Sequence, residues 1–473
     1  LRYLTMTAPV LLWFRRDLRL ADNPALTAAI ATGRPVLPIF ILDPQTESIG
    51  AATKWRLGLA LDALGSSLRT PLVLRRGPAL QVLRELIAET GSQELHYARD
   101  YTAQAIERDT EIKSTLGAEG ISVTSHNALL LFEPWTVSTG TGSYYKVYTP
   151  FWKAVRNRDV AMPLPAPTAF KTAPHPPSDT LAEWSLDTAM NRGSAVVRAH
   201  VQPGEQRALN RLARFLDDNI DSYKIDRDRM DLQATSGLSE NLTWGEISPR
   251  TIWQAGQTAR DQGRPGAEHF LKELVWREFA YHLLFHAPDL AQRNWRQGWD
   301  NFGWRADNDD AQAWKQGRTG EPIVDAAMRE LYVTGRMHNR ARMIVGSYLT
   351  KHLMTDWRVG LDWFADCLVD WDPAANAMGW QWIAGCGPDA APYFRVFNPE
   401  TQGEKFDKAR AYRDLYLEGG EDQLGRSPFD DFLAAVPKKW GMDAKDPRPA
   451  RFISLAAGRI RALEAYAGSK GAR

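Results

Sequence analysis

The stretch between Trp357 and Asp407 concentrates the side chains best suited to holding a large polar ring. It contains five tryptophans, and two of them flank a single glutamine. Asp370, Asp372 and Asn376 stand among these indoles and could hydrogen-bond to such a ring. Any one tryptophan is explained well enough as core filling, because indoles are large and mostly buried. The whole set is harder to explain in that way, so this region is our first candidate for a cofactor site.

A hydroxyl-rich turn follows Tyr223 and precedes a predicted helix. Backbone N–H groups and hydroxyls at the start of a helix are suited to binding a phosphate. The same residues also make an ordinary helix cap, and the run by itself leaves both interpretations open. The turn reads TSGLS and consists of Thr235, Ser236, Gly237, Leu238 and Ser239.

Two predicted helices carry further polar groups at meaningful spacing. Glu273 and Trp276 are three residues apart, which places a carboxylate and an indole on one helix face. Asn339 and Met343 are four apart and share a face of the next helix. His338 comes one residue before Asn339, which turns it by about 100° around a helix. We therefore expect His338 to pack or to hydrogen-bond locally.

These motifs resemble those of the photolyase/cryptochrome family, and most closely the class I and class III bacterial photolyases of cyclobutane pyrimidine dimers. The match is nearly letter for letter over GWQW, DAAPYFR and FNPETQGEKFD, and it extends to ELVWREF and to WFRRDLRLADNPAL near the start. The resemblance covers almost the whole chain. It implies light-driven dimer repair by a deoxyribodipyrimidine photo-lyase that acts on UV-damaged DNA, single- or double-stranded.

The resemblance also implies the cofactor, FAD, with an ion pair of Arg342 and Asp370 beside its ring system. Asn376 would face flavin N5, where an amide does not readily deliver a proton and so favours the anionic reduced form. The family more often has arginine at the position of Gly237, so one phosphate contact is missing here. The implied FAD-binding residues are Tyr223, Thr235, Ser236, Gly237, Leu238, Ser239, Arg342, Asp370, Asp372 and Asn376.

In the family, the counterparts of Glu273 and Trp276 contact the pyrimidine dimer, and that of Trp382 forms a second aromatic wall. Enzymes that repair (6-4) photoproducts have histidines at the positions of Asn339 and Met343, so this chain follows the cyclobutane-dimer pattern. The family's electron relay falls on Trp380, Trp357 and Trp304, with Trp363 or Trp371 as another branch. Its DNA phosphate contacts fall on Arg227, Arg340 and Arg395.

The elements that must position these residues fall into an α/β part and a helical part. Short β-rich runs alternate with amphipathic helices up to about residue 135, which predicts a Rossmann-like parallel sheet covered by helices. After about residue 205 the apolar spacing is helical throughout. We expect an antenna domain over 1–135, an extended Pro-rich connector over 136–204 and a helical FAD-binding domain over 205–473. The expected strands are Val10–Phe14, Val36–Leu42, Leu72–Arg75, Leu95–Tyr97 and Ile121–Thr124.

Composition limits the alternatives. The chain has 58 basic and 57 acidic residues, so any DNA-binding surface must be a local patch. Its two cysteines, Cys367 and Cys386, exclude a disulfide framework and a four-cysteine iron–sulfur cluster. We expect no metal, no membrane span and no obligate protein partner. The expected protein is a cytoplasmic bacterial monomer that associates with the nucleoid when bound to DNA.

Three questions stay open at this stage. A cryptochrome, which senses light with the same cofactor but does not repair DNA, is the main alternative. The intact dimer-contact set and the lack of a long tail argue against it, and a plain flavoprotein oxidoreductase lacks a GxGxxG motif after the first strand. The identity of the antenna chromophore is the third question, and folate is favoured over 8-hydroxy-deazaflavin. Gln104 and Ala105 stand at the usual folate contact and lack its carboxylate. Class III relatives, however, bind the folate differently.

Overall fold

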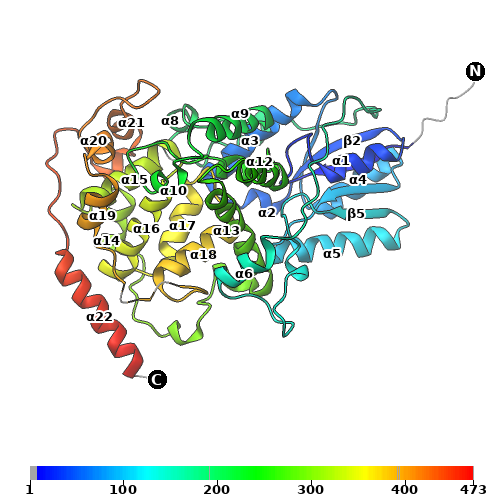
Figure 1. Cartoon of the computed structure of the whole chain (residues 1–473). Coiled ribbons are helices and arrows are strands. Elements are labelled where there is room, and N and C mark those ends of the chain that lie inside the picture. Colours follow the sequence, from blue (N-terminus) through cyan, green and yellow to red (C-terminus); the bar gives the residue numbers. More distant parts are fainter. Residues whose placement is uncertain (1–7, 191, 391, 394, 472–473) are drawn as a thin grey trace, which may run out of the picture.

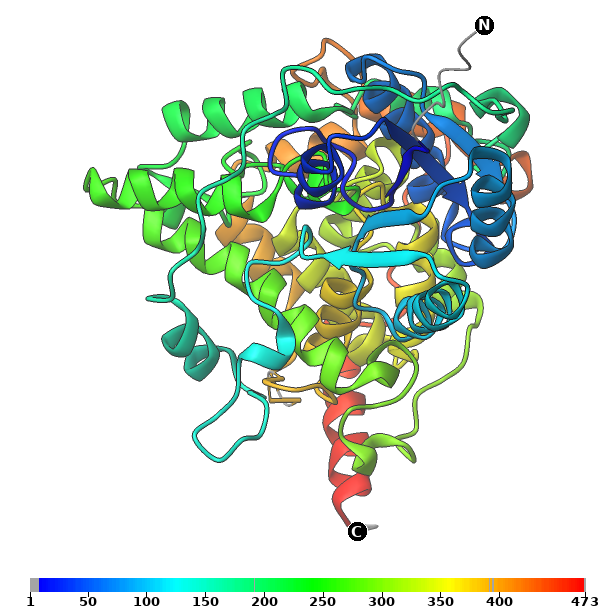
Figure 2. The same cartoon turned by 90° about the vertical axis from the view of Figure 1, so that its right-hand side faces the viewer.

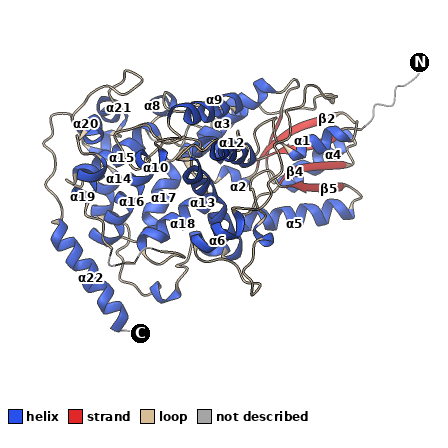
Figure 3. Cartoon of the chain, in the orientation of Figure 1, coloured by secondary structure: helices blue, strands red, loops and turns tan. Residues whose placement is uncertain are grey.

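A computed structural model describes residues 8–190, 192–390, 392–393 and 395–471 of the chain. All of its strands gather at one end of the molecule, and helices make up the rest (Figures 1 and 3). Among the described residues, no helix is both long and apolar enough to cross a membrane.

The sheet has five parallel strands in the order β3-β2-β1-β4-β5. Alternate residues of β1 point to opposite faces, so that Leu12 and Phe14 pack against α1 and α3 while Leu11 and Trp13 pack against α4 and α5. The prediction of a parallel sheet covered on both faces is confirmed. Figure 2 views this part of the molecule from the sheet side. The strands are β1 Val10–Phe14, β2 Val36–Leu42, β3 Val73–Arg76, β4 Glu94–Ala98 and β5 Ser122–His126.

Helices of the first two hundred residues cover the sheet or lead away from it. Their bounds are α1 Pro24–Ala31, α2 Pro44–Glu47, α3 Ala51–Ser67, α4 Ala79–Thr90, α5 Ala103–Ala118, α6 Tyr148–Val155, α7 Leu181–Trp184 and α8 Ser194–Arg198.

The remaining helices form the second part, in which the structure describes no strand from residue 205 onward. They are α9 Glu205–Asp218, α10 Tyr223–Asp226, α11 Ser239–Thr243, α12 Pro249–Asp261, α13 Ala267–His286, α14 Asp309–Lys315, α15 Pro322–Thr334, α16 Asn339–Ser347, α17 Trp357–Cys367, α18 Pro373–Ala384, α19 Pro399–Phe406, α20 Ala411–Leu417, α21 Pro428–Ala435 and α22 Leu455–Gly471. Helix η4, Tyr348–His352, is a π-helix that continues α16.

The expected extended connector is only partly extended. Residues 161–177 contain no helix, as the density of prolines predicted, but α6, α7 and α8 also lie within 136–204. The prediction was wrong for these stretches. Helix α6 forms because Tyr148, Phe151, Trp152 and Val155 recur at helical spacing and are buried. Our division of the chain at residues 135 and 205 remains a proposal.

A buried cluster of charges joins the two parts. Arg56 on α3 donates through Nε to Glu240 at 2.9 Å and through Nη1 to Glu246 at 3.1 Å, and all three side chains are fully buried. Burial opposes ionisation of Glu240, but Arg336, Arg56 and Arg211 outweigh it and lower the pKa of this carboxyl to about 2. Glu240 lies on α11, the helix that the TSGLS turn leads into, so this cluster fixes that turn relative to the sheet.

We predict that Arg56→Met destabilises the protein by about 3 to 5 kcal/mol, because two buried carboxylates lose their shared partner. Urea unfolding followed by circular dichroism measures this change. Arg84→Met is the matched control, since Arg84 pairs with Glu119 on the exposed surface, where solvent screens the interaction. Equal stability losses in the two variants would contradict the assigned role of the buried cluster.

Candidate cofactor and substrate site

A cavity of about 240 Å³ in the helical part gathers most of the residues singled out from the sequence. Thr235 and Gly237 belong to the same turn but do not line it. Six separate segments contribute to its wall, so the cavity exists only in the folded chain. The predicted residues that line it are Tyr223, Ser236, Leu238, Ser239, Glu273, Arg342, Asp370, Asp372 and Asn376.

One wall of the cavity carries a fixed pattern of charge. Arg342 on α16 donates through Nη2 to both carboxylate oxygens of Asp370, at 3.0 and 2.8 Å. Its Nε donates to the Met337 carbonyl, which holds the guanidinium in one orientation. The Asn376 side-chain amide donates to the Asp372 carbonyl at 3.0 Å. A cation, an acid and an amide are therefore held side by side before any ligand arrives.

Asp372 has partners that the sequence did not reveal. Its Oδ1 caps α18 by accepting from the Ala375 N–H. Its Oδ2 accepts from the Tyr281 hydroxyl at 2.8 Å and from Arg16 Nη2 at 3.2 Å. Arg16 comes from the WFRRDLRL motif in the first part of the chain, for which the sequence indicated no partner. The tertiary structure shows that the motif reaches across to the cavity.

The TSGLS turn is built around Gly237, whose φ of +61° is a conformation that favours glycine. Arg211 on α9 lies beneath it and donates through Nη1 to the Gly237 carbonyl at 2.7 Å. The cation that relatives often carry at position 237 is thus present nearby from another helix. An arginine on α9 with ordinary helical spacing gave no signal of this in the sequence.

The donor set fits a dinucleotide with a polar ring system. Arg277 on α13 lines the cavity, and its buried Nη2 has no hydrogen-bond partner. A buried guanidinium N–H without an acceptor is costly, and a ligand oxygen or ring nitrogen would satisfy it. Serine hydroxyls, the Arg342–Asp370 pair and apolar side chains all line the cavity. These are the groups that the phosphates and the isoalloxazine of FAD require.

Glu273 and Trp276 lie one turn apart on α13, as predicted. The Trp276 ring stacks on that of Tyr148 from α6, with centroids 3.6 Å apart and planes 8° apart. The Tyr148 hydroxyl donates to the Lys272 carbonyl at 2.6 Å, and the Tyr148 N–H donates to Asp389. Tyr148 therefore fixes the indole against α13. Tyr148 lies within the expected connector, and its local sequence gave no indication of this contact.

The other predicted substrate contacts lie on α16 and α18. Asn339 is the first residue of α16 and is exposed, and Met343 lies one turn later and is half-buried. His338 caps α16: its Nδ1 accepts from the Arg340 N–H at 3.1 Å. Burial lowers the pKa of His338 to about 4, so this imidazole is neutral at pH 7. Trp382 is half-buried on α18 and packs against the core.

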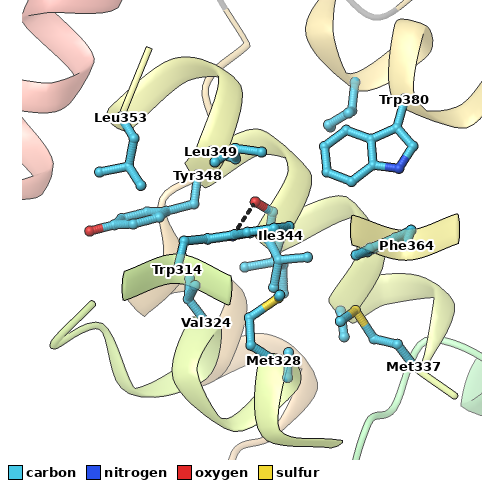
Figure 4. Close-up of a cluster of buried hydrophobic side chains, with 14 of the residues drawn as sticks. Trp314, Val324, Met328, Met337, Ile344, Tyr348, Leu349, Leu353, Phe364 and Trp380 are labelled. Carbon is cyan, nitrogen blue, oxygen red and sulfur yellow. Dashed lines mark hydrogen bonds between the residues drawn. The ribbon is translucent and has the colours of Figure 1, made fainter. Parts of the chain in front are cut away.

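The three predicted relay tryptophans belong to one core. Trp380 on α18 packs directly against α17, because a Cβ at Gly360 would lie only 2.1 Å from its ring. Trp357 is buried one turn before Gly360 and donates through Nε1 to Asn294 at 2.9 Å. Trp304 is half-buried and donates to the Thr350 carbonyl. Figure 4 shows that Trp380 also lies near Phe364 and Trp314, whose rings are 4.9 and 6.2 Å from its own.

The predicted DNA-contacting arginines are not all free. Arg227 forms an ion pair with Glu273, and its side chain is only 13% exposed. Arg340 donates to Asp228 at 2.5 Å. Arg395 is exposed. Two of the three cations are therefore already paired with carboxylates.

Comparisons with known proteins agree with this geometry. The family model "DNA photolyase" matches residues 10–169, and "FAD binding domain of DNA photolyase" matches residues 270–468. A deoxyribodipyrimidine photo-lyase of Agrobacterium fabrum is 43% identical over 98% of both chains. Cryptochrome-1 of Arabidopsis thaliana is 33% identical over 89% of this chain and 63% of its own length. The crystal structure of a bacterial class III photolyase from Agrobacterium tumefaciens superposes with a TM-score of 0.89, at 42% identity and 98% coverage of both chains.

We predict that Tyr148→Ala destabilises the protein by about 3 kcal/mol, since it removes a buried aromatic ring, and that it releases the Trp276 ring. Tyr148→Phe keeps the stack, loses one hydrogen bond and should cost about 1 kcal/mol. Chemical unfolding measures both values. Acrylamide quenching, compared with the same protein carrying Trp276→Phe, separates the exposure of Trp276 from that of the other seventeen tryptophans. Equal quenching in the wild type and in Tyr148→Ala would show that the stack does not hold the indole.

Proposed function

Because this chain belongs to the photolyase/cryptochrome family, we propose that it is a flavin-dependent deoxyribodipyrimidine photo-lyase that repairs cyclobutane pyrimidine dimers in DNA. One observation supports this activity above the others. The cavity that fits FAD is lined by Glu273, and Trp276 lies one turn away on the same helix. Side chains that suit the cofactor and side chains that suit a pyrimidine dimer therefore share one site.

Reduced FAD, when it is bound and excited by blue light, supplies the electron that splits the dimer. The protein residues bind, orient and compensate charge. Arg342 compensates the negative charge of the reduced ring, and Asp370 fixes the position of that guanidinium. Ser236, Ser239 and Arg277 hold the phosphates and the polar ring edge. Asn376 offers an amide that does not ionise, so no proton is delivered from this side.

The dimer would be flipped out of the DNA stack and enter beside α13, which costs a few kcal/mol. Trp276 and Trp382 would hold the flipped bases, and each stacking contact contributes about 1 to 3 kcal/mol. Glu273 would hydrogen-bond to the base edges, and its carboxylate becomes available when Arg227 turns to a DNA phosphate. Met343 and Asn339 would complete the wall. Arg227, Arg340 and Arg395 would contact phosphates without reading base sequence.

The relay of Trp380, Trp357 and Trp304 would return the oxidised flavin to its active state. Its support is the packing of Trp380 against the helix that carries Trp357. Trp363 or Trp371 could offer a second branch.

A cryptochrome-type photoreceptor is the alternative function, and the match to Cryptochrome-1 keeps it in view. The presence of Glu273, Trp276, Met343 and Trp382 together favours repair. A dimer-repair assay under blue light with reduced enzyme tests the proposal: repair supports the photo-lyase, and bound FAD without repair supports the photoreceptor.

We also propose a folate antenna, bound in a second cavity that is lined by Tyr332, Trp363 and Trp440. Trp363 Nε1 and the Tyr332 hydroxyl are buried there without partners. Gln312 and Asp366 supply an amide and a carboxylate, and Arg192, Lys315 and Lys439 supply positive charge. These are the groups that a pterin with an anionic tail requires.

A larger cavity at the carboxyl ends of β2 and β3 is the competing antenna site. It measures about 690 Å³ and includes Gln104, but its described lining residues contain no aromatic ring. Ala105 is fully buried and does not line this cavity. The aromatic cavity therefore suits a folate better.

We propose that the protein acts as a monomer in a reducing bacterial cytoplasm. Both cysteines are buried and unpaired, as a reducing compartment allows.

We predict that Glu273→Ala leaves FAD bound but lowers the quantum yield of repair several-fold, because the carboxylate would stabilise charge on the dimer. The measurement is dimer repair at saturating substrate and known photon flux. Glu268→Ala is the control, since the exposed Glu268 lies five residues earlier on α13, pairs with Lys272 and does not line the cavity. An unchanged yield in Glu273→Ala would remove Glu273 from the mechanism.

We predict repair of thymine cyclobutane dimers and no turnover of (6-4) photoproducts. Repair of a (6-4) photoproduct requires a proton donor in contact with the lesion, and neither Asn339 nor Met343 can ionise. His338 is neutral at any pH well above its pKa of about 4, and its Nδ1 is already occupied by the cap. Chromatography of irradiated oligonucleotides with each lesion measures the outcome. Repair of (6-4) lesions would show that the subfamily assignment is wrong.

We predict that Trp440→Ala removes the near-ultraviolet absorption of a bound folate while FAD stays bound, because the variant opens the aromatic cavity. Gln104→Ala, in the competing cavity, should leave the spectrum unchanged. The reverse pattern would place the antenna at the edge of the sheet.

A further inference from the structure

A small cavity of about 160 Å³ lies beside the outer end of the predicted relay. It is enclosed between helix η3, Gln297–Trp299, the end of α18 and the C-terminal helix α22, which runs along the edge of the helical part in Figure 1. Three aromatic rings form its walls: Trp299, Tyr393 and Tyr466. It is separate from the cofactor cavity and from both antenna candidates, and the mechanism above does not use it.

The rings of this cavity continue the relay. Trp299 stacks on Trp304 with centroids 5.6 Å apart and planes 20° apart. On the cavity side, Tyr466 stacks on Trp299 at 5.8 Å and 23°. Because Trp299 stacks on Trp304, it covers one face of that ring. Trp299 also lines the cavity, although it is only 6% exposed. A reductant bound there would be in contact with a ring that touches the outermost relay residue.

The chemistry of the walls indicates which molecules would bind. Arg296 is exposed at the cavity, and the bond that its guanidinium makes to the Gly385 carbonyl is long, at 3.5 Å. No carboxylate is present among the described residues that line the cavity. Aromatic faces bind flat molecules, and a guanidinium selects an anion with oxygen atoms in one plane. Gly385, with a φ of +93°, keeps the wall open, since a Cβ there would lie 3.3 Å from the Tyr393 ring.

We propose that this cavity binds the external electron donor for photoreduction, a small planar anionic reductant of the enediolate class. The inference rests on the relay proposed above. After Trp304 has passed one electron inward, Trp299 transfers one electron to it, and the bound donor transfers one electron to Trp299. An enediolate monoanion loses that electron together with its remaining enediol proton, which passes to water. Each event leaves one donor radical in solution and one electron in the protein.

Ascorbate is the probe. In the dark, saturation-transfer NMR with the FAD-loaded protein should detect bound ascorbate, and Arg296→Gln should weaken the signal. Under anaerobic blue light, the initial rate of flavin photoreduction should saturate as the ascorbate concentration rises. Arg296→Gln should raise the half-saturating concentration several-fold and leave the rate with neutral dithiothreitol unchanged. Arg293→Gln, an exposed arginine three residues away that does not line the cavity, is the matched control.

Trp299→Phe should lower the maximal rate with both donors. A rate that stays linear in ascorbate for the wild type, or equal effects of Arg296→Gln and Arg293→Gln, would overturn the proposal. Wild-type photoreduction in Trp357→Phe would overturn it by removing the relay. Dimer repair by chemically reduced enzyme reports separately on the proposed photo-lyase activity, so failure of the donor site and failure of the repair function are distinguishable.

Discussion

The buried pairing of arginines with carboxylates between the two parts of the chain is the interaction on which the rest of the structure depends. Arg56 reaches from α3 to Glu240 and Glu246, and Arg16 reaches from the loop after β1 to Asp372. Charges buried to this degree are tolerated only when every partner is in place. The docking of the sheet on the helices is therefore cooperative, and the TSGLS turn and the Asp372 wall are fixed by the same contacts.

This arrangement explains why an α/β domain without an evident catalytic residue matters to the helical site. Arg16 and Tyr281 hold one carboxylate oxygen of Asp372, while the other oxygen caps α18. The helix so capped carries Asn376, Trp380 and Trp382. A change in the loop after β1 would thus be transmitted to the cofactor, to the relay and to the substrate wall. These contacts fix the positions of whole helices around the cavity, and not only the positions of single side chains, before a ligand binds.

The arginines proposed to contact DNA include two that are paired with carboxylates. Arg227 holds Glu273, and Arg340 holds Asp228. Phosphate binding would exchange one ion pair for another, so the net electrostatic gain per contact is smaller than for a free arginine, and salt would weaken it further. Under the proposed function, the same exchange would release the Glu273 carboxylate when the DNA backbone is in place.

The sequence by itself determined the class of fold, because strand and helix periodicity are local properties that repeat along the chain. The parallel sheet, the helical second part and nine of the residues that line the cavity could be predicted from periodicity, spacing and family resemblance. Tyr148, Arg211, Arg277 and Arg16 could not be predicted, because each acts on a partner far away in sequence and has ordinary neighbours in its own segment. The pairing of Arg227 with Glu273 and the stack of Trp299 on Trp304 were decided only by the tertiary structure, since a ring contact or an ion pair depends on the distance between helices, and that distance is set by the packing of the whole core.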